Sequence, residues 1–327
     1  MKAIVQSKYG SADVLRLEDV DKPTAASGEV LVKIYATSVH AGDWHLMRGT
    51  PLFIRLVFGG WRKPNMKTIG TDIAGQVEAV GREVSQFKPG DQVFGDLSES
   101  GFGAFAEYVS VPEKALALKS VNLTFEQAAT IPVSGLAALQ ALRDVGKVKP
   151  GQSVMILGAS GGVGSFAVQL AKAFGAEVTG VCSTQKAAMV KLLGADHIID
   201  YTQNSLTEKE ESYDLIIDAA AYRSFFKLLP LLAHGGTYVS VGGSTVELFR
   251  ALLLGGLVSL FDKKHQRKVK CLVSKPTQSD LRRLKALAED SKIKPFIDRN
   301  YPLSGVPDAI RYLEQRKVKG KISISVQ

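Results

Sequence analysis

A glycine-rich turn between an apolar strand and an amphipathic helix most constrains how this 327-residue chain can fold. The glycines follow an apolar run with the spacing Gly158-x-x-Gly161-x-x-Gly164. From Val163 to Phe174, apolar residues recur at the spacing of a helix with one buried face. Glycine lets the backbone approach a pyrophosphate, whose charge the free N–H groups of a helix N-terminus bind. The pattern predicts a dinucleotide site; a purely structural turn is the alternative.

The next predicted strand runs from Glu177 to Cys182. The residues at its end indicate whether the dinucleotide is NAD or NADP. NAD sites carry an acid there that binds the ribose 2′-hydroxyl. No Asp or Glu occurs from Val178 to Ala195, and the strand is followed by Ser183, Thr184 and Lys186. Hydroxyls and a cation suit a 2′-phosphate, so the sequence favours NADPH over NADH. In the other reading, the two hydroxyl residues cap the next helix and the lysine is a solvated surface charge.

Apolar strands alternate with helical segments through the middle of the chain, which predicts a doubly wound parallel sheet. The small, apolar residues from Phe125 to Val145 are expected to form a packed helix near the start of this domain. Gly175 follows the amphipathic helix, where a left-handed cap is expected. The predicted strands are 153–157, 177–182, 197–201, 213–218 and 237–241.

The first third of the chain carries strand signals without intervening helices, which predicts a partly open β-barrel. Its runs include Glu29 to Tyr35, Asp72 to Val80 and Glu107 to Val111. The tail is expected to pack back on this domain as strand 269–273, helix 279–290, helix 307–316 and strand 321–326. The sequence thus predicts an α/β protein with a barrel domain of residues 1–122 and 262–327 and a Rossmann domain of residues 123–261.

Composition excludes several classes of protein. Lys and Arg number 41 against 32 Asp and Glu, a net charge of +9 that favours an anionic ligand. The densest basic run, Lys263 to Lys270, has no aromatic residues for base stacking, so a solvated loop and no nucleic-acid partner are expected. Ala251 to Phe261 is eleven residues long, whereas a membrane span needs about 20. A buried or subunit-contact helix is expected there, with a lipid-facing interfacial segment as the alternative and no stable membrane insertion.

Two cysteines without C-x-x-C spacing favour a reducing compartment. The first ten residues lack the apolar region of a secretory signal. A cytoplasmic location is expected.

Several further motifs resemble the medium-chain dehydrogenase/reductase superfamily, and within it the zinc-free quinone oxidoreductases and alkenal or enone reductases. The resemblance covers essentially the whole chain, and a subgroup that includes a plant chloroplast-envelope quinone oxidoreductase homologue is similar in more detail. The motifs are Thr37 to Val39, Gly42 to Trp44, Ala74-Gly75, Val80-Gly81, Phe87 to Val93, Ser134 to Leu139, the glycine turn, Leu193 to Asp196 and Gly320 to Ile322.

The resemblance implies a GroES-like domain, a Rossmann domain with bound NADPH, and hydride transfer to a quinone or to the β-carbon of an α,β-unsaturated carbonyl. It places Ser134 and Gly242 near the nicotinamide. It also implies that the protein is a homodimer in solution. The expected cofactor-binding residues are Ser134, Gly158, Ser160, Gly161, Gly162, Val163, Gly164, Ser183, Thr184, Lys186, Tyr201, Ala219, Gly242 and Lys321.

The positions that hold zinc in related alcohol dehydrogenases carry other residues here, so no metal is expected. His40 stands where the family's ligand Cys would be and Thr71 where its His would be. Many zinc-free relatives have Asn in place of His40. The resemblance implies that NADPH binds in a cleft between the two domains. His40 either lines this cleft as a neutral side chain or takes a catalytic part, orienting the carbonyl or relaying a proton. Asp43 and Trp44 are expected to shape the same wall, and residues 50–66 to enclose an apolar acceptor or to form an ordinary packed loop.

Two other functions stay open from the sequence. The first is a zinc-independent alcohol or aldehyde oxidoreductase. The second is a non-catalytic NADPH-binding protein that docks on a membrane or another anionic partner through residues 251–270.

Overall fold

The computed structural model describes residues 1–58, 60–203, 205–206, 212–242 and 245–327. They form two compact units, the first of Met1–Val133, Pro276–Ser291 and Pro295–Gln327, and the second of Ser134–Lys275 and Lys292–Lys294. The predicted boundaries after residues 122 and 261 differ from these. Residues 125–129 pack on barrel strands, and residues 268–271 pair with the parallel sheet of the second unit.

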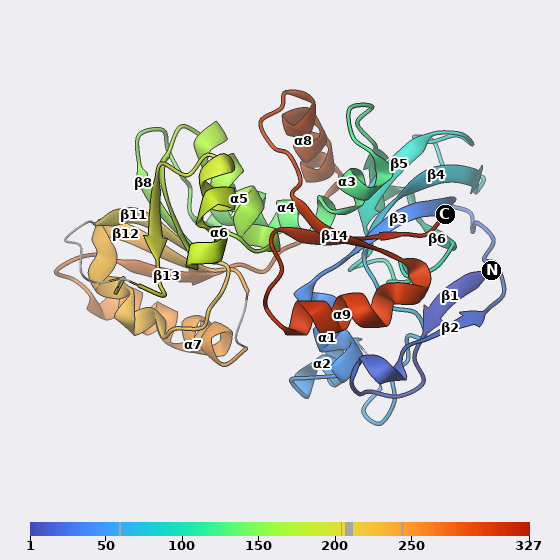
Figure 1. Cartoon of the computed structure of the whole chain (residues 1–327), viewed down its shortest axis with the longest axis horizontal. Helices are drawn as coiled ribbons and strands as arrows, with labels where there is room; N and C mark the ends of the chain where they lie inside the picture. The colour runs from blue at the N-terminus through green and yellow to red at the C-terminus, as the bar shows by residue number, and fades with distance from the viewer. Residues whose placement is uncertain (59, 204, 207–211, 243–244) are drawn as a thin grey trace. The chain divides into compact units, whose positions relative to one another are not determined.

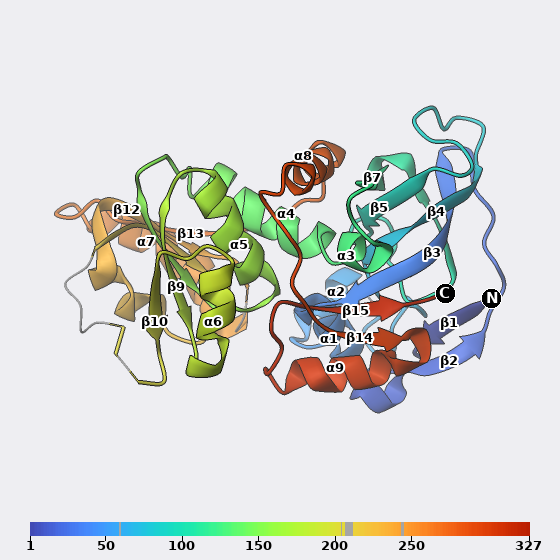
Figure 2. The same ribbon diagram turned by 45° about the horizontal axis from the view of Figure 1, so that its top comes forward.

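The first unit is built on a mostly antiparallel sheet of order β14-β15-β3-β4-β5-β7, in which β6 also pairs with β3. Strand β3 places Val30, Val32 and Ile34 in the core at every second position, as a half-buried strand must. The C-terminal β15 pairs with β3, so the last strand of the chain lies beside a strand from its first forty residues (Figure 2). Both ends of the chain lie in this unit (Figure 1), and β1 pairs with β2 in a separate two-stranded sheet. The strands are β1 (Lys2–Val5), β2 (Arg16–Asp19), β3 (Glu29–Val39), β4 (Asp72–Val80), β5 (Gln92–Asp96), β6 (Tyr108–Pro112), β7 (Leu116–Leu118), β14 (Ile297–Pro302) and β15 (Lys321–Ser325).

Helices surround this sheet. The expectation that the first third of the chain has no intervening helices is wrong, because α1 and α2 lie between β3 and β4. Helix α3 packs on β3 and β4, and α9 contacts α1. The predicted helix from Phe125 to Val145 is wrong as a single element, because α3 ends at Ala129 and α4 starts at Pro132. Proline lacks an N–H and disfavours a helical conformation in the preceding residue, so the chain breaks there. The helices are α1 (Ala41–Arg48), α2 (Phe53–Phe58), α3 (Phe125–Ala129), α8 (Gln278–Glu289) and α9 (Val306–Glu314).

The second unit has a six-stranded sheet of order β10-β9-β8-β11-β12-β13 in which every pair is parallel. The order reverses between β8 and β11, which is where ligands bind in open α/β sheets. The predicted α/β class, with a GroES-like unit and a Rossmann unit, is confirmed. The strands are β8 (Ser153–Leu157), β9 (Glu177–Cys182), β10 (His197–Asp200), β11 (Tyr213–Asp218), β12 (Leu232–Ser240) and β13 (Lys268–Cys271).

Helices α5 and α6 pack on strands β8 to β10, and α7 packs on β13 (Figure 2). Gly175 follows α5 with φ +80°, so the predicted left-handed cap is confirmed. In the part of the chain that the structure describes, no helix has both the length and the apolar character needed to span a bilayer. The helices are α4 (Pro132–Gln140, continued by a π-helical turn Ala141–Val145), α5 (Gly162–Ala173), α6 (Thr184–Leu192) and α7 (Thr245–Phe261).

Candidate active site

The glycine turn leaves the carboxyl end of β8 and leads into α5. Gly158 has φ +71°, a conformation that residues with a side chain rarely adopt. A Cβ at Gly164 would lie 2.1 Å from the Gly158 carbonyl oxygen, so the first turn of α5 packs directly on the loop. Gly158 and Gly164 are therefore required by the geometry of this close approach, whereas a Cβ at Gly161 would lie 3.4 Å from the Gly158 carbonyl oxygen, an ordinary contact.

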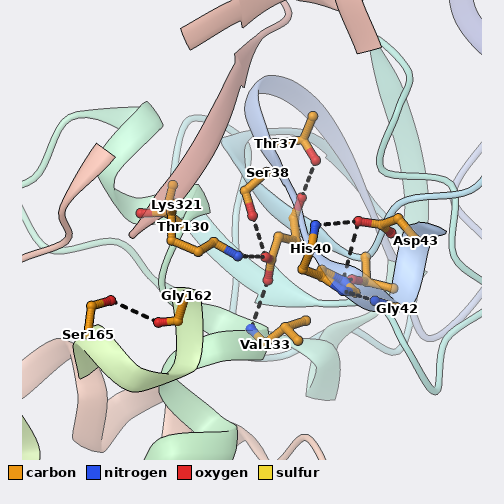
Figure 3. Close-up of polar contacts among 12 residues, drawn as sticks. Thr37, Ser38, His40, Gly42, Asp43, Thr130, Val133, Gly162, Ser165 and Lys321 are labelled. Carbon is orange, nitrogen blue, oxygen red and sulfur yellow. Dashed lines mark hydrogen bonds and ion pairs between the residues drawn. The ribbon is translucent and has the colours of Figure 1, made fainter. Parts of the chain in front are cut away.

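The start of α5 can bind an anion. Gly161 is the N-cap and has no side chain to satisfy the N–H groups of the first turn, which carries no acidic residue. The hydroxyl of Ser165 donates to the Gly162 carbonyl oxygen at 2.9 Å, inside the helix itself (Figure 3). Free N–H groups and the positive end of the helix dipole fit a pyrophosphate here.

The residues predicted around the 2′-phosphate lie at the ends of β9 and β10. Ser183 is the N-cap of α6, but its hydroxyl makes no capping hydrogen bond. The Thr184 hydroxyl donates to the carboxylate of Asp200, the last residue of β10. The sequence reasoning missed this acid because it lies outside the stretch that follows β9. Tyr201 is half exposed, and its N–H donates to the Cys182 carbonyl oxygen at 3.1 Å.

The other predicted cofactor residues divide into two sets. Ala219 and Gly242 follow β11 and β12, at the same sheet edge as Gly158, and Ser160 is buried within the turn. Ser134 is buried on α4, outside the sheet. Lys321 lies in the first unit, where its ammonium is buried against an aspartate. That burial favours a structural ion pair over the cofactor contact predicted from the resemblance.

Asp72 is the centre of a buried polar cluster in the first unit, and its partners Ser38, Val133 and Lys321 are labelled in Figure 3. Its Oδ2 lies 3.1 Å from Lys321 Nζ and also accepts a hydrogen bond from the Ser38 hydroxyl. Its Oδ1 accepts the Val133 N–H at 2.8 Å. Asp72 and Lys321 are 0% and 2% exposed, so the ion pair is fully desolvated and each charge depends on the other.

His40 lies beside this cluster as the N-cap of α1, with its ring oriented by the backbone. The Gly42 N–H donates to His40 Nδ1 at 3.0 Å, so Nδ1 carries no proton. In the neutral ring, Nε2 is therefore protonated and donates to Thr71 Oγ1 at 2.5 Å. Burial lowers the pKa of His40 to about 4, against the opposing effect of the Asp72 charge. At neutral pH the ring is uncharged and holds the Thr71 hydroxyl.

The structure places Asp43 and Trp44 differently from one another. Asp43 is fully buried, and its Oδ2 accepts the His40 N–H at 2.9 Å, which closes a capping box on α1. Burial raises the pKa of Asp43. Trp44 is partly buried, and its indole N–H donates to Glu314 Oε1 at 2.5 Å. Asp43 thus fixes the backbone of His40 through a buried hydrogen bond, whereas the Trp44 indole is hydrogen-bonded to the last residue of α9.

The predicted acceptor wall, residues 50–66, contains α2 and several exposed apolar side chains. Leu52, Leu56 and Trp61 are all more than half exposed. Gly59 lies outside the described residues. The segment is therefore not a buried loop, and its part in acceptor binding stays a prediction.

No metal cluster appears among the described residues: nowhere do three or more His, Cys, Asp or Glu side chains lie close enough to hold an ion. His40 contacts Thr71, which is a poor zinc ligand, and Asp72 is occupied by Lys321.

Asp96, opposite Asp72 across β4 and β5, gives the first unit a pH dependence. Asp96 is 5% exposed, and burial, with the Asp72 charge adding to it, raises its pKa from 3.8 to about 6. Between these two values the folded protein binds more protons than the unfolded chain, so stability falls as pH rises through this window and stays lower above it. The difference corresponds to about 3 kcal/mol.

Asp96→Asn is expected to remove the loss of stability that accompanies rising pH, because the amide is never charged. Its free energy of unfolding should exceed that of the wild type by about 3 kcal/mol at pH 7.5 and by little at pH 4. Urea unfolding of both proteins at the two pH values measures the difference. The same stability gap at pH 4 and 7.5 would show that Asp96 does not titrate in this window.

Two protein families match successive parts of the chain. Residues 26–121 match the alcohol dehydrogenase GroES-like domain. Residues 193–324 match the family described as zinc-binding dehydrogenase. In the first unit, however, His40 and Thr71 stand where related zinc alcohol dehydrogenases are expected to carry their Cys and His ligands. Together with the glycine turn, these matches define a medium-chain dehydrogenase/reductase.

Whole-length relatives narrow this class. The 2-methylene-furan-3-one reductase of Solanum lycopersicum is 34% identical over 99% of this chain and 79% of its own length. The chloroplastic NADPH-dependent alkenal/one oxidoreductase of Arabidopsis thaliana is 33% identical with the same coverage. The structure of the quinone oxidoreductase from Coxiella burnetii superposes with a TM-score of 0.87 at 30% identity, covering 100% of this chain and 99% of that one. The chain belongs to the zinc-free quinone oxidoreductase group of the medium-chain dehydrogenase/reductase superfamily.

Proposed function

We propose that this protein is an NADPH-dependent oxidoreductase that reduces quinones or the conjugated carbon–carbon double bond of α,β-unsaturated carbonyl compounds. The observation that carries the proposal is the glycine turn at the carboxyl end of β8, which has no room for a side chain at Gly164, in a chain of this family. When bound, NADPH supplies the hydride, and a proton from solvent completes the two-electron reduction. The protein's own residues bind the dinucleotide, orient the acceptor and exclude water.

Preference for NADPH over NADH is supported by the residues after β9. Ser183, Lys186 and Tyr201 would hold the 2′-phosphate, and α6 presents its N-terminus there without a side-chain cap. Asp200 opposes this preference because its carboxylate would repel a phosphate, although it accepts hydrogen bonds from Thr184 and Thr202. The relative from Arabidopsis is named for NADPH, which favours the same cofactor here.

The surroundings of His40 favour a role in orienting the acceptor over a role as a catalytic acid. Because the pKa of His40 is near 4, the ring is neutral at neutral pH and holds no imidazolium proton to release; its one N–H, on Nε2, is too weak an acid and is hydrogen-bonded to Thr71. We propose that His40 and Thr71 form a fixed hydrogen-bonding edge toward the acceptor. The proton that completes reduction then comes from solvent.

Turnover with four acceptors tests the function. NADPH oxidation, followed by its near-ultraviolet absorbance, is measured with an ortho-quinone, a 2-alkenal, the matching saturated aldehyde and no acceptor, and each is repeated with NADH. We expect turnover with the quinone or the alkenal, none with the saturated aldehyde, and preference for NADPH. Turnover of the saturated aldehyde would instead favour an alcohol or aldehyde oxidoreductase. Tight NADPH binding without any turnover would favour a binding protein.

We also propose a homodimer and a cytoplasmic location. Strand β13 is the edge of the described six-stranded sheet, and the adjoining α7 exposes Leu252, Leu253 and Leu260. An open strand edge next to an exposed apolar helix suits contact with a second copy. Both cysteines, Cys182 and Cys271, are free thiols, which supports a reducing compartment.

A further inference from the structure

A buried pair of polar side chains lies at the ends of strands β11 and β12. Asp218 is the last residue of β11 and Tyr238 lies on β12, and each is 1% exposed. The Tyr238 hydroxyl donates to Asp218 Oδ2 at 2.8 Å. Burial raises the pKa of both groups. A polar pair this costly to bury has to be hydrogen-bonded, and its partners indicate what it holds in place.

The other carboxylate oxygen holds the turn that follows β11. Asp218 Oδ1 accepts the N–H groups of Ala220 at 3.1 Å and of Ala221 at 2.6 Å. Ala221 has φ +44°, a left-handed conformation that a residue with a Cβ adopts only at a cost in free energy. Because the turn is strained, it keeps this shape only where other contacts fix it, and Asp218 supplies two of them.

This turn packs directly on the glycine turn. A Cβ at Gly158 would lie 3.0 Å from Ala220 Cβ and 3.3 Å from Ala220 N. Strand β11 pairs with β8, with Asp218 opposite Leu157, so both turns leave the sheet at the same edge. Any movement of Ala220 therefore changes the space in which Gly158 takes its left-handed conformation.

We infer that Asp218 is a positioning residue for dinucleotide binding, because its hydrogen bonds hold residues 219–221 against Gly158 and so keep the glycine turn in the shape that admits a pyrophosphate. The inference rests on the proposed NADPH site. Strand β9, which leads to the proposed 2′-phosphate site, lies on the opposite side of β8 from β11. Asp218 therefore acts on the pyrophosphate part of the cofactor and not on the 2′-phosphate part.

Comparing the binding of two ligands distinguishes this positioning role from a general contribution to the stability of the fold. NADPH and 2′-AMP, which has the 2′-phosphate but no pyrophosphate, are titrated calorimetrically into wild type, Asp218→Ala and Asp218→Asn. We expect Asp218→Ala to raise the Kd of NADPH about tenfold or more, since two N–H groups of a buried turn lose their acceptor, and to leave the Kd of 2′-AMP within about twofold. Asp218→Asn keeps an oxygen for those N–H groups and should bind NADPH within about threefold of wild type.

The outcomes are distinct. Equal loss of both ligands in Asp218→Ala, or no loss of either, would overturn the inference while leaving the NADPH site in place. A wild-type protein that does not bind NADPH would overturn the proposed function itself. If Asp218→Ala does not fold, Tyr238→Phe replaces it, because it removes one hydrogen bond and keeps the carboxylate. This variant should raise the Kd of NADPH about threefold with 2′-AMP unchanged, and an unchanged Kd for NADPH would overturn the inference.

Discussion

Gly164→Ala is expected to weaken NADPH binding at least about tenfold and to lower the free energy of unfolding by about 1–3 kcal/mol. The new Cβ would lie 2.1 Å from the Gly158 carbonyl oxygen and 2.8 Å from Ala159 Cα. Both neighbours are backbone atoms, so α5 has to move away from the turn to make room. The free N–H groups at the start of the helix then no longer point at the pyrophosphate position. Fluorescence titration with NADPH and urea unfolding measure the two effects.

Gly256→Ala is the matched control in the same unit. Gly256 lies on the exposed side of α7, and a Cβ there meets no atom within 4 Å. Alanine is favoured over glycine in a helix by roughly 0.5–1 kcal/mol, so this variant should be slightly stabilised and should bind NADPH as the wild type does. Because Gly256 lies on the same exposed face of α7 as Leu252 and Leu260, size-exclusion chromatography checks that the variant keeps the oligomeric state of the wild type. Unchanged NADPH affinity in Gly164→Ala would contradict the assignment of the turn as the phosphate site.

Lys321→Met should destabilise the folded protein by about 3–5 kcal/mol, because it leaves the Asp72 carboxylate buried without its cation. Methionine has nearly the length of lysine, so the loss reports the charge and not a cavity. Ser38 and the Val133 N–H still donate to Asp72, but two neutral donors do not replace a buried ammonium. The free energy of unfolding from urea titration measures the effect.

The double variant Asp72→Asn with Lys321→Met is the control for that prediction. It removes both charges, and buried ion pairs replaced as a pair by neutral groups often cost little. We expect it to recover more than half of the stability that Lys321→Met loses, with the remainder due to the hydrogen bonds of Asp72. If Lys321→Met alone lowered the free energy of unfolding by less than about 1 kcal/mol, the other donors to Asp72 would be sufficient to stabilise its carboxylate.

Several strands of the parallel sheet were predictable because they are short runs rich in apolar residues, although β12 begins at Leu232, five residues before the predicted start. Residues 153–157, 177–182 and 213–218 were predicted with the bounds that the structure has. Strand β14, Ile297–Pro302, was missed, since it lies at a sheet edge and its side chains are half-buried or exposed. Burial on one face produces the alternating pattern, and an edge strand without that burial gives no such signal.

The candidate site was predictable to the extent that it is local in sequence. The glycine turn needs only the strand before it and the helix after it, so Gly158, Gly161 and Gly164 could be assigned from their spacing. Asp200 is the last residue of β10, 16 positions after Thr184, and nothing near Thr184 indicates the contact. The role of His40 also stayed open, because its tautomer depends on Gly42 and its partner Thr71 is 31 residues away.

The class of fold, the glycine turn and the family resemblance were all predictable from the sequence, because strand periodicity, glycine spacing and short motifs are properties of neighbouring residues. The pairing of charges, in contrast, depends on the tertiary structure. Lys321 and Asp72 are 249 positions apart, and they meet because β15 and β4 both pair with β3. Likewise, Asp218 reaches the glycine turn only because β11 lies beside β8. Contacts of this kind depend on strand order and register, which arise from packing of the whole sheet and leave no local pattern in the chain.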